Sequence, residues 1–176
     1  MKVEEKIVDC ENIFDGRIFD VKKYAVELPD GSRAFREEVE HHGGACVLAF
    51  DDGYVYLVKQ YRLALRDETI EIPAGKLEKG EDPETCALRE LTEETGLVAE
   101  SIRKICAVSP SPGYTNEIIH IYYVERFIKA KQRLDDGEFL NVIKLPAKKC
   151  FEMVESGEII DGKTVVALLW LKSRLA

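Results

Sequence analysis

The sequence has no long apolar run and no excess of positive charge. No stretch approaches the roughly 20 apolar residues that a membrane-spanning helix needs, and Met1–Lys6 is not followed by the apolar segment of a signal peptide. The chain has 25 basic and 33 acidic residues, so its formal net charge is −8. Nucleic-acid-binding surfaces are usually basic. We therefore expect no membrane and no nucleic-acid partner, although local cations could still bind a small anionic substrate.

Cysteines are few, and none forms a recognisable pair. The five are Cys10, Cys46, Cys86, Cys106 and Cys150. An odd number without a Cys-x-x-Cys motif favours reduced thiols over a disulfide framework or a zinc site, so we expect a cytoplasmic protein. The chain of 176 residues is 45% hydrophobic and has no repeat or low-complexity tract. This size and composition suit one domain with a small appendage.

The hydrophobic pattern predicts strands around a few helices. We predict strands at 17–28, 33–40, 45–50, 54–59, 69–73, 102–109 and 118–127, and C-terminal helices at 147–156 and 163–175. Val166, Leu169 and Trp170 are candidates for the buried face of the last helix. Such a mixture of strands and helices is typical of an α/β domain.

Another helix is predicted to begin at Pro83, with Asp82 as its N-cap, and to end at Gly96. Its apolar stripe would contain Ala87, Leu88, Leu91 and Thr95.

Three glutamates, Glu90, Glu93 and Glu94, lie within about one and a half turns of this helix. Two carboxylates about 5 Å apart repel by roughly 3 kcal/mol at an effective dielectric constant of about 20. A hard divalent cation would remove this penalty, because Mg²⁺ binds carboxylate oxygens together with water and substrate phosphates. The alternative is an acidic face exposed to solvent.

The spacing of Gly75, Glu81, Arg89-Glu90-Leu91, Glu93-Glu94 and Gly96-Leu97 resembles the Nudix hydrolase box at every defining position. The resemblance extends over residues 17–172 and is strongest at 69–117. It implies an α/β/α sandwich with a mixed sheet at 43–176 and a small antiparallel β-hairpin region at 1–42. It also implies hydrolysis of a nucleoside diphosphate linked to another group, with roughly one to three Mg²⁺ or Mn²⁺ ions.

The same resemblance implies roles for residues in and around the box. The backbone carbonyl of Ala74 and the carboxylates of Glu90, Glu94 and Glu93 would bind metal, with Glu93 also a catalytic candidate. Arg89 would orient the neighbouring glutamates, and Gly96 would be structural. Gly75 would let the backbone approach metal or phosphate closely.

The segment Ser109–Glu117 suggests the substrate. It contains Ser-Pro-Gly-Tyr, and its Pro112 stands fifteen residues past Leu97. This resembles the ADP-ribose pyrophosphatase subgroup of Nudix hydrolases, which implies substrate contacts from Pro112, Gly113 and Glu117. A rigid loop without a binding role is the alternative.

The resemblance implies further substrate contacts from the N-terminal strands and from the strand that precedes the box. Arg62 would contact the pyrophosphate, because a planar guanidinium binds two phosphate oxygens at once. Its alternative role is a surface cation beside Asp67 or Glu68. Phe19 and Arg36 would stack on the two faces of the adenine. In relatives these contacts are often made across a homodimer whose subunits exchange their N-terminal hairpins. An aromatic residue in a strand can instead be part of the core.

A separate catalytic base would come from a loop before the C-terminal helices. Glu138 is the first candidate and Asp136 the second, although acids beside Gly137 are also ordinary turn residues. The reaction implied is metal-assisted attack of water on ADP-ribose, which gives AMP and ribose 5-phosphate. Another nucleotide-sugar or dinucleotide pyrophosphatase and a non-catalytic ADP-ribose sensor are the alternatives. A P-loop is excluded because Glu81-Asp82 follows Gly80 where Lys-Ser/Thr is required.

Overall fold

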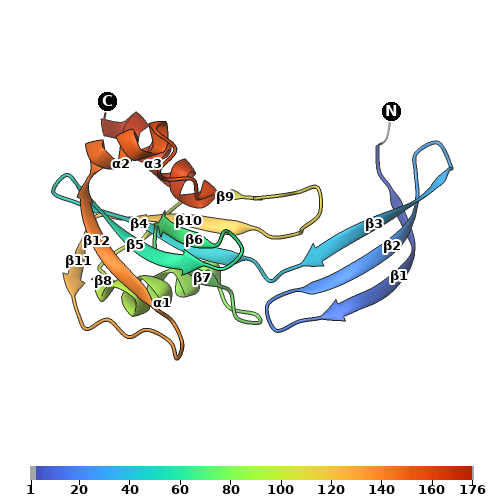
Figure 1. Cartoon of the computed structure of the whole chain (residues 1–176), viewed down its shortest axis with the longest axis horizontal. Coiled ribbons are helices and arrows are strands. Elements are labelled where there is room, and N and C mark those ends of the chain that lie inside the picture. The colour runs from blue at the N-terminus through green and yellow to red at the C-terminus, as the bar shows by residue number, and fades with distance from the viewer. Residues whose placement is uncertain (1–2, 176) are drawn as a thin grey trace. The chain divides into compact units, whose positions relative to one another are not determined.

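The computed structural model describes residues 3–175 and divides into two compact units (Figure 1). The first unit contains the chain up to Gly43 together with Ser109–Ile118. The second contains Gly44–Val108 and the chain from Ile119 onward. The loop 109–118 therefore belongs with the N-terminal strands, which no sequence pattern indicated.

The first unit is an antiparallel sheet of β1 (Lys6–Asp15), β2 (Asp20–Glu27) and β3 (Arg33–Glu40), in that order. The predicted hairpin of β2 and β3 is confirmed. Two hydrogen bonds join the loop to β3: the Val39 N–H donates to the Tyr114 carbonyl at 2.7 Å, and the Thr115 hydroxyl donates to the Val39 carbonyl at 2.8 Å. These bonds attach the predicted substrate loop to the hairpin sheet.

The second unit is built on a mixed sheet with the path β12-β5-β4-β10-β9. Only β10 and β4 run parallel along this path. Two short strands, β6 and β7, pair with β5 and β4, and β11 pairs with β8 in a separate ribbon. The strands are β4 (Gly44–Asp51), β5 (Tyr54–Arg62), β6 (Asp67–Glu71), β7 (Ala74–Lys76), β8 (Leu97–Ala99), β9 (Arg103–Val108), β10 (Ile119–Val124), β11 (Phe127–Lys129) and β12 (Leu140–Pro146).

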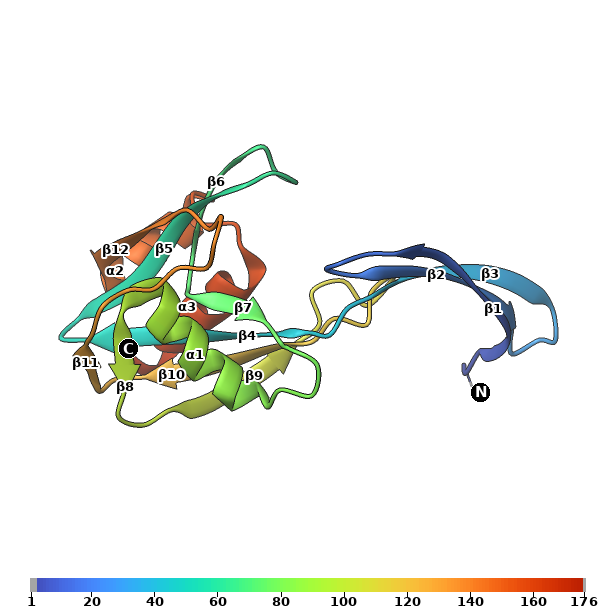
Figure 2. The same cartoon turned by 90° about the horizontal axis from the view of Figure 1, so that it is seen from below.

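Helices cover both faces of this sheet (Figure 2): α1 (Pro83–Thr95) on one, α2 (Ala147–Glu155) and α3 (Gly162–Leu175) on the other. Alternation along β4 explains the two layers, because successive side chains of a strand point to opposite faces. Cys46 and Leu48 pack in the cluster with α2 and α3, whereas Val47 packs in the cluster with Leu91 of α1. The predicted α/β/α sandwich is confirmed.

Helix α1 has the predicted ends. The Asp82 carboxylate accepts hydrogen bonds from the N–H groups of Glu84 and Thr85, and Gly96 adopts the left-handed conformation with φ = 69°. The predicted apolar stripe is only partly right. Leu88 and Thr95 are half-buried, and the fully buried residues are Cys86, Ala87, Leu91 and Glu94.

The predicted inner face of α3 is wrong at two positions. Val166 and Leu169 are 36% and 49% exposed, while Trp170 is partly buried against the core. The buried residues are Thr164, Ala167, Leu168 and Leu171. Since α3 is apolar almost all the way round, periodicity cannot select the face, and a buried threonine is not an obvious core residue. Among the described residues, no helix is long and apolar enough to span a membrane.

Candidate active site

Arg89 is the centre of the acidic cluster on α1. Its guanidinium donates to Glu81 through Nε at 3.0 Å and through Nη2 at 3.1 Å. Nη1 donates to Glu90 at 2.7 Å and to Glu93 at 3.0 Å. The hydrogen bonds to Glu81 are the largest cause of a raised pKa for Arg89, so the cation is permanent. One guanidinium therefore holds three carboxylates in fixed orientations.

Glu90 lies directly against the backbone of Gly75. A Cβ atom at residue 75 would stand 1.8 Å from Glu90 Oε1, so only glycine leaves room for this carboxylate. Burial raises the pKa of Glu90, and the nearby charges of Glu93 and Glu138 add to this increase, while Arg89 opposes it. A carboxylate held at such an energetic cost gains from a cation.

Glu94 is the most buried acid of the cluster, with 1% of its surface exposed. Its Oε2 accepts a hydrogen bond of 2.8 Å from the Ala74 N–H. Burial raises the pKa of Glu94 to about 8, and the charges of Glu90 and Glu138 contribute, although the Ala74 N–H lowers it. The Ala74 carbonyl is the metal ligand predicted from the sequence, whereas the contact in the structure is made by the N–H of the same residue.

Glu138 lies in the loop between β11 and β12, where Gly137 has φ = 86°. Its backbone N–H donates to the Asp135 carbonyl at 3.0 Å, and its carboxylate accepts from the Asp135 N–H at 3.3 Å. The charge of Glu138 is close enough to raise the pKa values of both Glu90 and Glu94. The fold thus brings Glu138 near the acidic helix from 44 residues away in sequence.

The donor set suits a hard divalent cation, because Glu90 and Glu94 offer carboxylate oxygens beside the close-packed backbone of Gly75. Between residues 3 and 175, no three His, Cys, Asp or Glu side chains are already arranged as a metal cage. The position of Arg89 explains why the carboxylates do not converge on a common point, because Glu90 and Glu93 both accept hydrogen bonds from its Nη1. An ion would have to compete with Arg89 for Glu90.

Arg62 has a different partner from the two acids expected from the sequence. Its Nε and Nη2 each donate to Glu71, both at 2.7 Å, while Glu68 pairs with Lys59. Burial tends to raise the pKa of Glu71, but Arg62, Lys163 and Thr69 outweigh it and hold the value at about 2.

Glu71 and its partners at the start of α3 were not among the site residues predicted from the sequence. A charged residue inside the predicted strand 69–73 was the available signal for Glu71. For Asp161, the signal was its position three residues before Thr164, which is typical of an N-cap.

The adenine candidates Phe19 and Arg36 do not meet within one chain. Phe19 directly precedes β2, whereas Arg36 on β3 is paired with Tyr24. Five residues of strand separate the two positions by roughly 17 Å. Arg36 donates to Glu5 at 2.6 Å, and the ring of Phe19 is 6.1 Å from that of Phe14. A sandwich by these two residues would need two copies of the chain.

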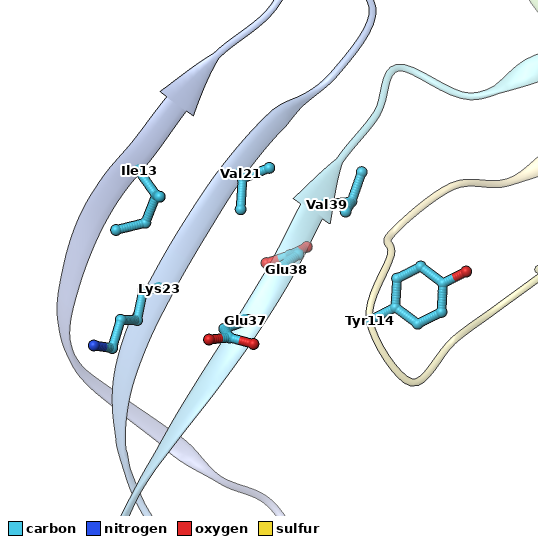
Figure 3. A pocket seen from close by; sticks show the side chains of 7 residues that line it. All are labelled: Ile13, Val21, Lys23, Glu37, Glu38, Val39 and Tyr114. Atoms are coloured by element: carbon cyan, nitrogen blue, oxygen red, sulfur yellow. The ribbon is translucent and has the colours of Figure 1, made fainter. Parts of the chain in front are cut away.

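A pocket of about 500 Å³ lies within the first unit (Figure 3). It combines side chains of the three strands with Tyr114 of the loop, and neither Phe19 nor Arg36 lines it. The lining residues are Ile13, Val21, Lys23, Glu37, Glu38, Val39 and Tyr114.

The loop that contains Pro112 and Gly113 is ordered by local hydrogen bonds. The N–H groups of Tyr114 and Thr115 donate to the Ser111 carbonyl at 3.2 Å. The Glu117 N–H donates to the Thr115 hydroxyl at 3.2 Å, and its carboxylate lies 3.6 Å from His41 Nδ1. A Cβ atom at Gly113 would meet nothing within 4 Å, so this glycine is not required by packing.

An α/β/α sandwich with a glycine-backed acidic helix defines a Nudix-type protein. Comparison with protein families matches residues 40–159 to the NUDIX domain, and the chain belongs to the Nudix family.

Two curated relatives are similar over almost the whole chain. ADP-ribose pyrophosphatase of Bacillus subtilis (strain 168) is 44% identical over 177 residues, which cover 99% of this chain and 96% of the relative. The methanol dehydrogenase activator of Bacillus methanolicus is 41% identical over 172 residues, with 96% and 93% covered. A crystal structure of an ADP compounds hydrolase superposes with a TM-score of 0.87 at 20% identity, covering 99% of this chain and 96% of that one, which supports the fold.

Proposed function

We propose that this protein hydrolyses the diphosphate bond of ADP-ribose to AMP and ribose 5-phosphate. The observation that carries the proposal is the acidic cluster of α1, in which Arg89 orients Glu90 and Glu93, Glu90 lies against Gly75 and Glu94 accepts from the Ala74 N–H. Membership of the Nudix family supports the reaction class, and the similarity to an ADP-ribose pyrophosphatase supports the substrate.

Glu90 and Glu94 would hold a divalent cation, Mg²⁺ or Mn²⁺, with Glu93 and the Ala74 backbone as further contacts. When bound, such an ion neutralises charge on the diphosphate and lowers the pKa of a coordinated water. Arg89 keeps the carboxylates of Glu90 and Glu93 oriented before substrate arrives. Gly75 leaves the space in which Glu90 sits.

Glu138 would act as the general base. It would take a proton from the water as the water oxygen forms a bond to one phosphorus and the bridging P–O bond breaks. The liberated phosphate oxygen leaves with the second product, so that one water is consumed for each AMP and ribose 5-phosphate formed. Glu138 suits this role because the candidate metal ligands would be occupied, and its partner Asp135 N–H is a weak donor at 3.3 Å.

Arg62 would contact the diphosphate. Its bonds to Glu71 use Nε and Nη2, so Nη1 keeps N–H groups for a phosphate oxygen. Phe19, Arg36, Pro112, Gly113 and Glu117 remain predicted contacts for the rest of the substrate.

A homodimer in the cytoplasm completes the proposal. Several large apolar side chains of the first unit are exposed, among them Ile7, Phe14, Phe19 and Phe35, which suits contact with a second copy. All five cysteines are free thiols, as expected in a reducing compartment.

The test is a product assay on purified protein with Mg²⁺. The substrates are ADP-ribose, GDP-mannose, NADH, diadenosine polyphosphates and 8-oxo-dGTP, compared by kcat/KM. The highest value for ADP-ribose, with AMP and ribose 5-phosphate as products, is the expected result. Preference for another compound would keep the catalytic cluster and overturn the substrate. Tight binding of ADP-ribose without any turnover would instead indicate a sensor.

A further inference from the structure

A buried network of charges connects the start of α3 with the strand that leads into the acidic helix. The Asp161 carboxylate accepts from the Thr164 N–H at 3.0 Å and from the Thr164 hydroxyl at 2.5 Å. Its other oxygen accepts from Lys163 Nζ at 2.9 Å. Asp161 therefore caps α3 and fixes the direction of the Lys163 side chain.

Lys163 is buried between two carboxylates. Its side chain is 10% exposed, and Nζ donates to Glu71 Oε2 at 2.6 Å as well as to Asp161. Burial alone would lower the pKa of Lys163, but the charges of Asp161 and Glu71 raise it, so the amine stays protonated. Moving the buried ammonium away from either carboxylate would leave a buried charge without a partner, so the position of Nζ is restrained.

Glu71 is held from two sides by its donors. Oε2 accepts from Lys163 and from Arg62 Nη2, while Oε1 accepts from Arg62 Nε and from the Thr69 hydroxyl at 2.5 Å. The side chain is 3% exposed. Because both oxygens accept hydrogen bonds, the orientation of the carboxylate is fixed. The two parallel hydrogen bonds from Arg62 then fix the orientation of its guanidinium.

Arg62 is the most exposed of the four charged side chains, at 43%, compared with 20% for Asp161, 10% for Lys163 and 3% for Glu71. Without a fixed carboxylate behind it, such a side chain would sample several rotamers, and ordering it would weaken binding. Arg62 is therefore the most exposed end of the network, and that end is a cation.

We propose that Lys163 is a positioning residue for substrate binding, acting through Glu71 to hold the Arg62 guanidinium toward the diphosphate. This inference rests on the proposed function, since it requires Arg62 to bind a phosphate group. Because Lys163 is 10% exposed and its Nζ donates to Glu71 and Asp161, it would act through Glu71 and not by direct contact with substrate. Its contribution is to lower the conformational freedom of the residue that does.

The experiment compares kcat and KM for ADP-ribose in the wild type, Lys163→Met, Arg62→Ala and the double variant. In Lys163→Met we expect KM to rise roughly five- to tenfold with kcat changed less than about threefold, because the lost interaction binds ground state and transition state alike. Lys163→Arg should keep KM close to the wild type, because it retains the charge. In the Arg62→Ala background, Lys163→Met should give no further rise in KM, since coupled residues are not additive.

Lys172→Met is the matched control, because Lys172 lies on the same helix and pairs with Glu155 on α2. It should leave KM unchanged. Melting temperatures check that each variant folds. If Lys163→Met does not fold, Lys163→Gln keeps a hydrogen-bond donor without the charge, and its KM should rise by the same mechanism.

The outcomes separate the two proposals. An unchanged KM in Lys163→Met, or an equal rise with and without Arg62, would overturn the positioning role while leaving the proposed function intact. Failure of the wild type to hydrolyse ADP-ribose would overturn both. A raised KM that disappears in the Arg62→Ala background would support both.

Discussion

Arg62 at the end of β5 and Glu71 at the end of β6 share two hydrogen bonds of 2.7 Å. The guanidinium is partly exposed, and the carboxylate is almost completely buried. Burying an unpaired carboxylate is costly, so the folded state depends on both Arg62 and Lys163 as partners of Glu71. Arg62, a candidate substrate contact, therefore also contributes to the stability of the fold through Glu71.

The first prediction is that Glu71→Gln destabilises the protein in a pH-dependent way. The folded pKa of Glu71 is about 2 and its ordinary value is 4.5, so its ionisation stabilises the fold above about pH 4.5. This contribution, about 3 kcal/mol, is lost as the pH falls from about 5 towards 2. Urea unfolding at a series of pH values should show the wild type and variant converging in acid.

Glu68→Gln is the matched control, because Glu68 forms an exposed pair with Lys59 on the same hairpin. Its effect on the free energy of unfolding should be small, because an exposed ion pair contributes little to stability. A constant difference between the wild type and Glu71→Gln from pH 7 to pH 2 would contradict the first prediction.

The second prediction concerns Glu90→Gln and Glu94→Gln. Each should lower kcat by at least roughly 100-fold, because each removes a proposed charged ligand. Burial raises the pKa values of both residues, so a neutral glutamine should not lower the melting temperature. Steady-state kinetics at saturating Mg²⁺ and calorimetry measure the two effects. Normal turnover in either variant would remove that residue from the metal site.

The third prediction is that Gly75→Ala inactivates the protein without unfolding it. The new methyl group would stand 1.8 Å from Glu90 Oε1, and a flexible side chain can rotate away. Displacing a catalytic group by about 1 Å can lower kcat about 100-fold. In Gly162→Ala the Cβ atom meets nothing within 4 Å, so kcat should be unchanged. Full activity of Gly75→Ala would mean that the position of Glu90 does not matter.

The fourth prediction separates the two loop acids. Glu138→Gln should lower kcat about 100-fold while KM is largely kept, as expected for loss of a general base. Asp136→Asn, two residues away in the same loop, should have little effect on kcat, because the loop charge that raises the pKa values of Glu90 and Glu94 is that of Glu138. Kinetics of the two variants with ADP-ribose decide the assignment. An unchanged kcat in Glu138→Gln would exclude it as the base.

Local sequence signals were sufficient to predict helix α1, which carries the candidate metal ligands. Asp82, Pro83 and Gly96 define the ends of α1 through capping and a left-handed residue, which depend only on neighbouring backbone. The glutamates follow from these ends by helical spacing. On α3 the same method was wrong at Val166 and Leu169, because an almost entirely apolar helix gives no contrast between its faces.

The sequence by itself determined the helix that carries the glutamates and the strand hairpins, because these depend on capping, turn residues and alternation between neighbours in the chain. The sandwich followed from the resemblance of the box to the Nudix family. Only the tertiary structure decided the partner of Arg62, since Glu71 is brought to it by strand register and Lys163 by the docking of α3. The same holds for Glu138, whose charge reaches Glu90 and Glu94 through a loop. Charge interactions depend on distance in space and not on separation in sequence. The partners of Arg62 and Glu138 could therefore be identified only from the tertiary structure.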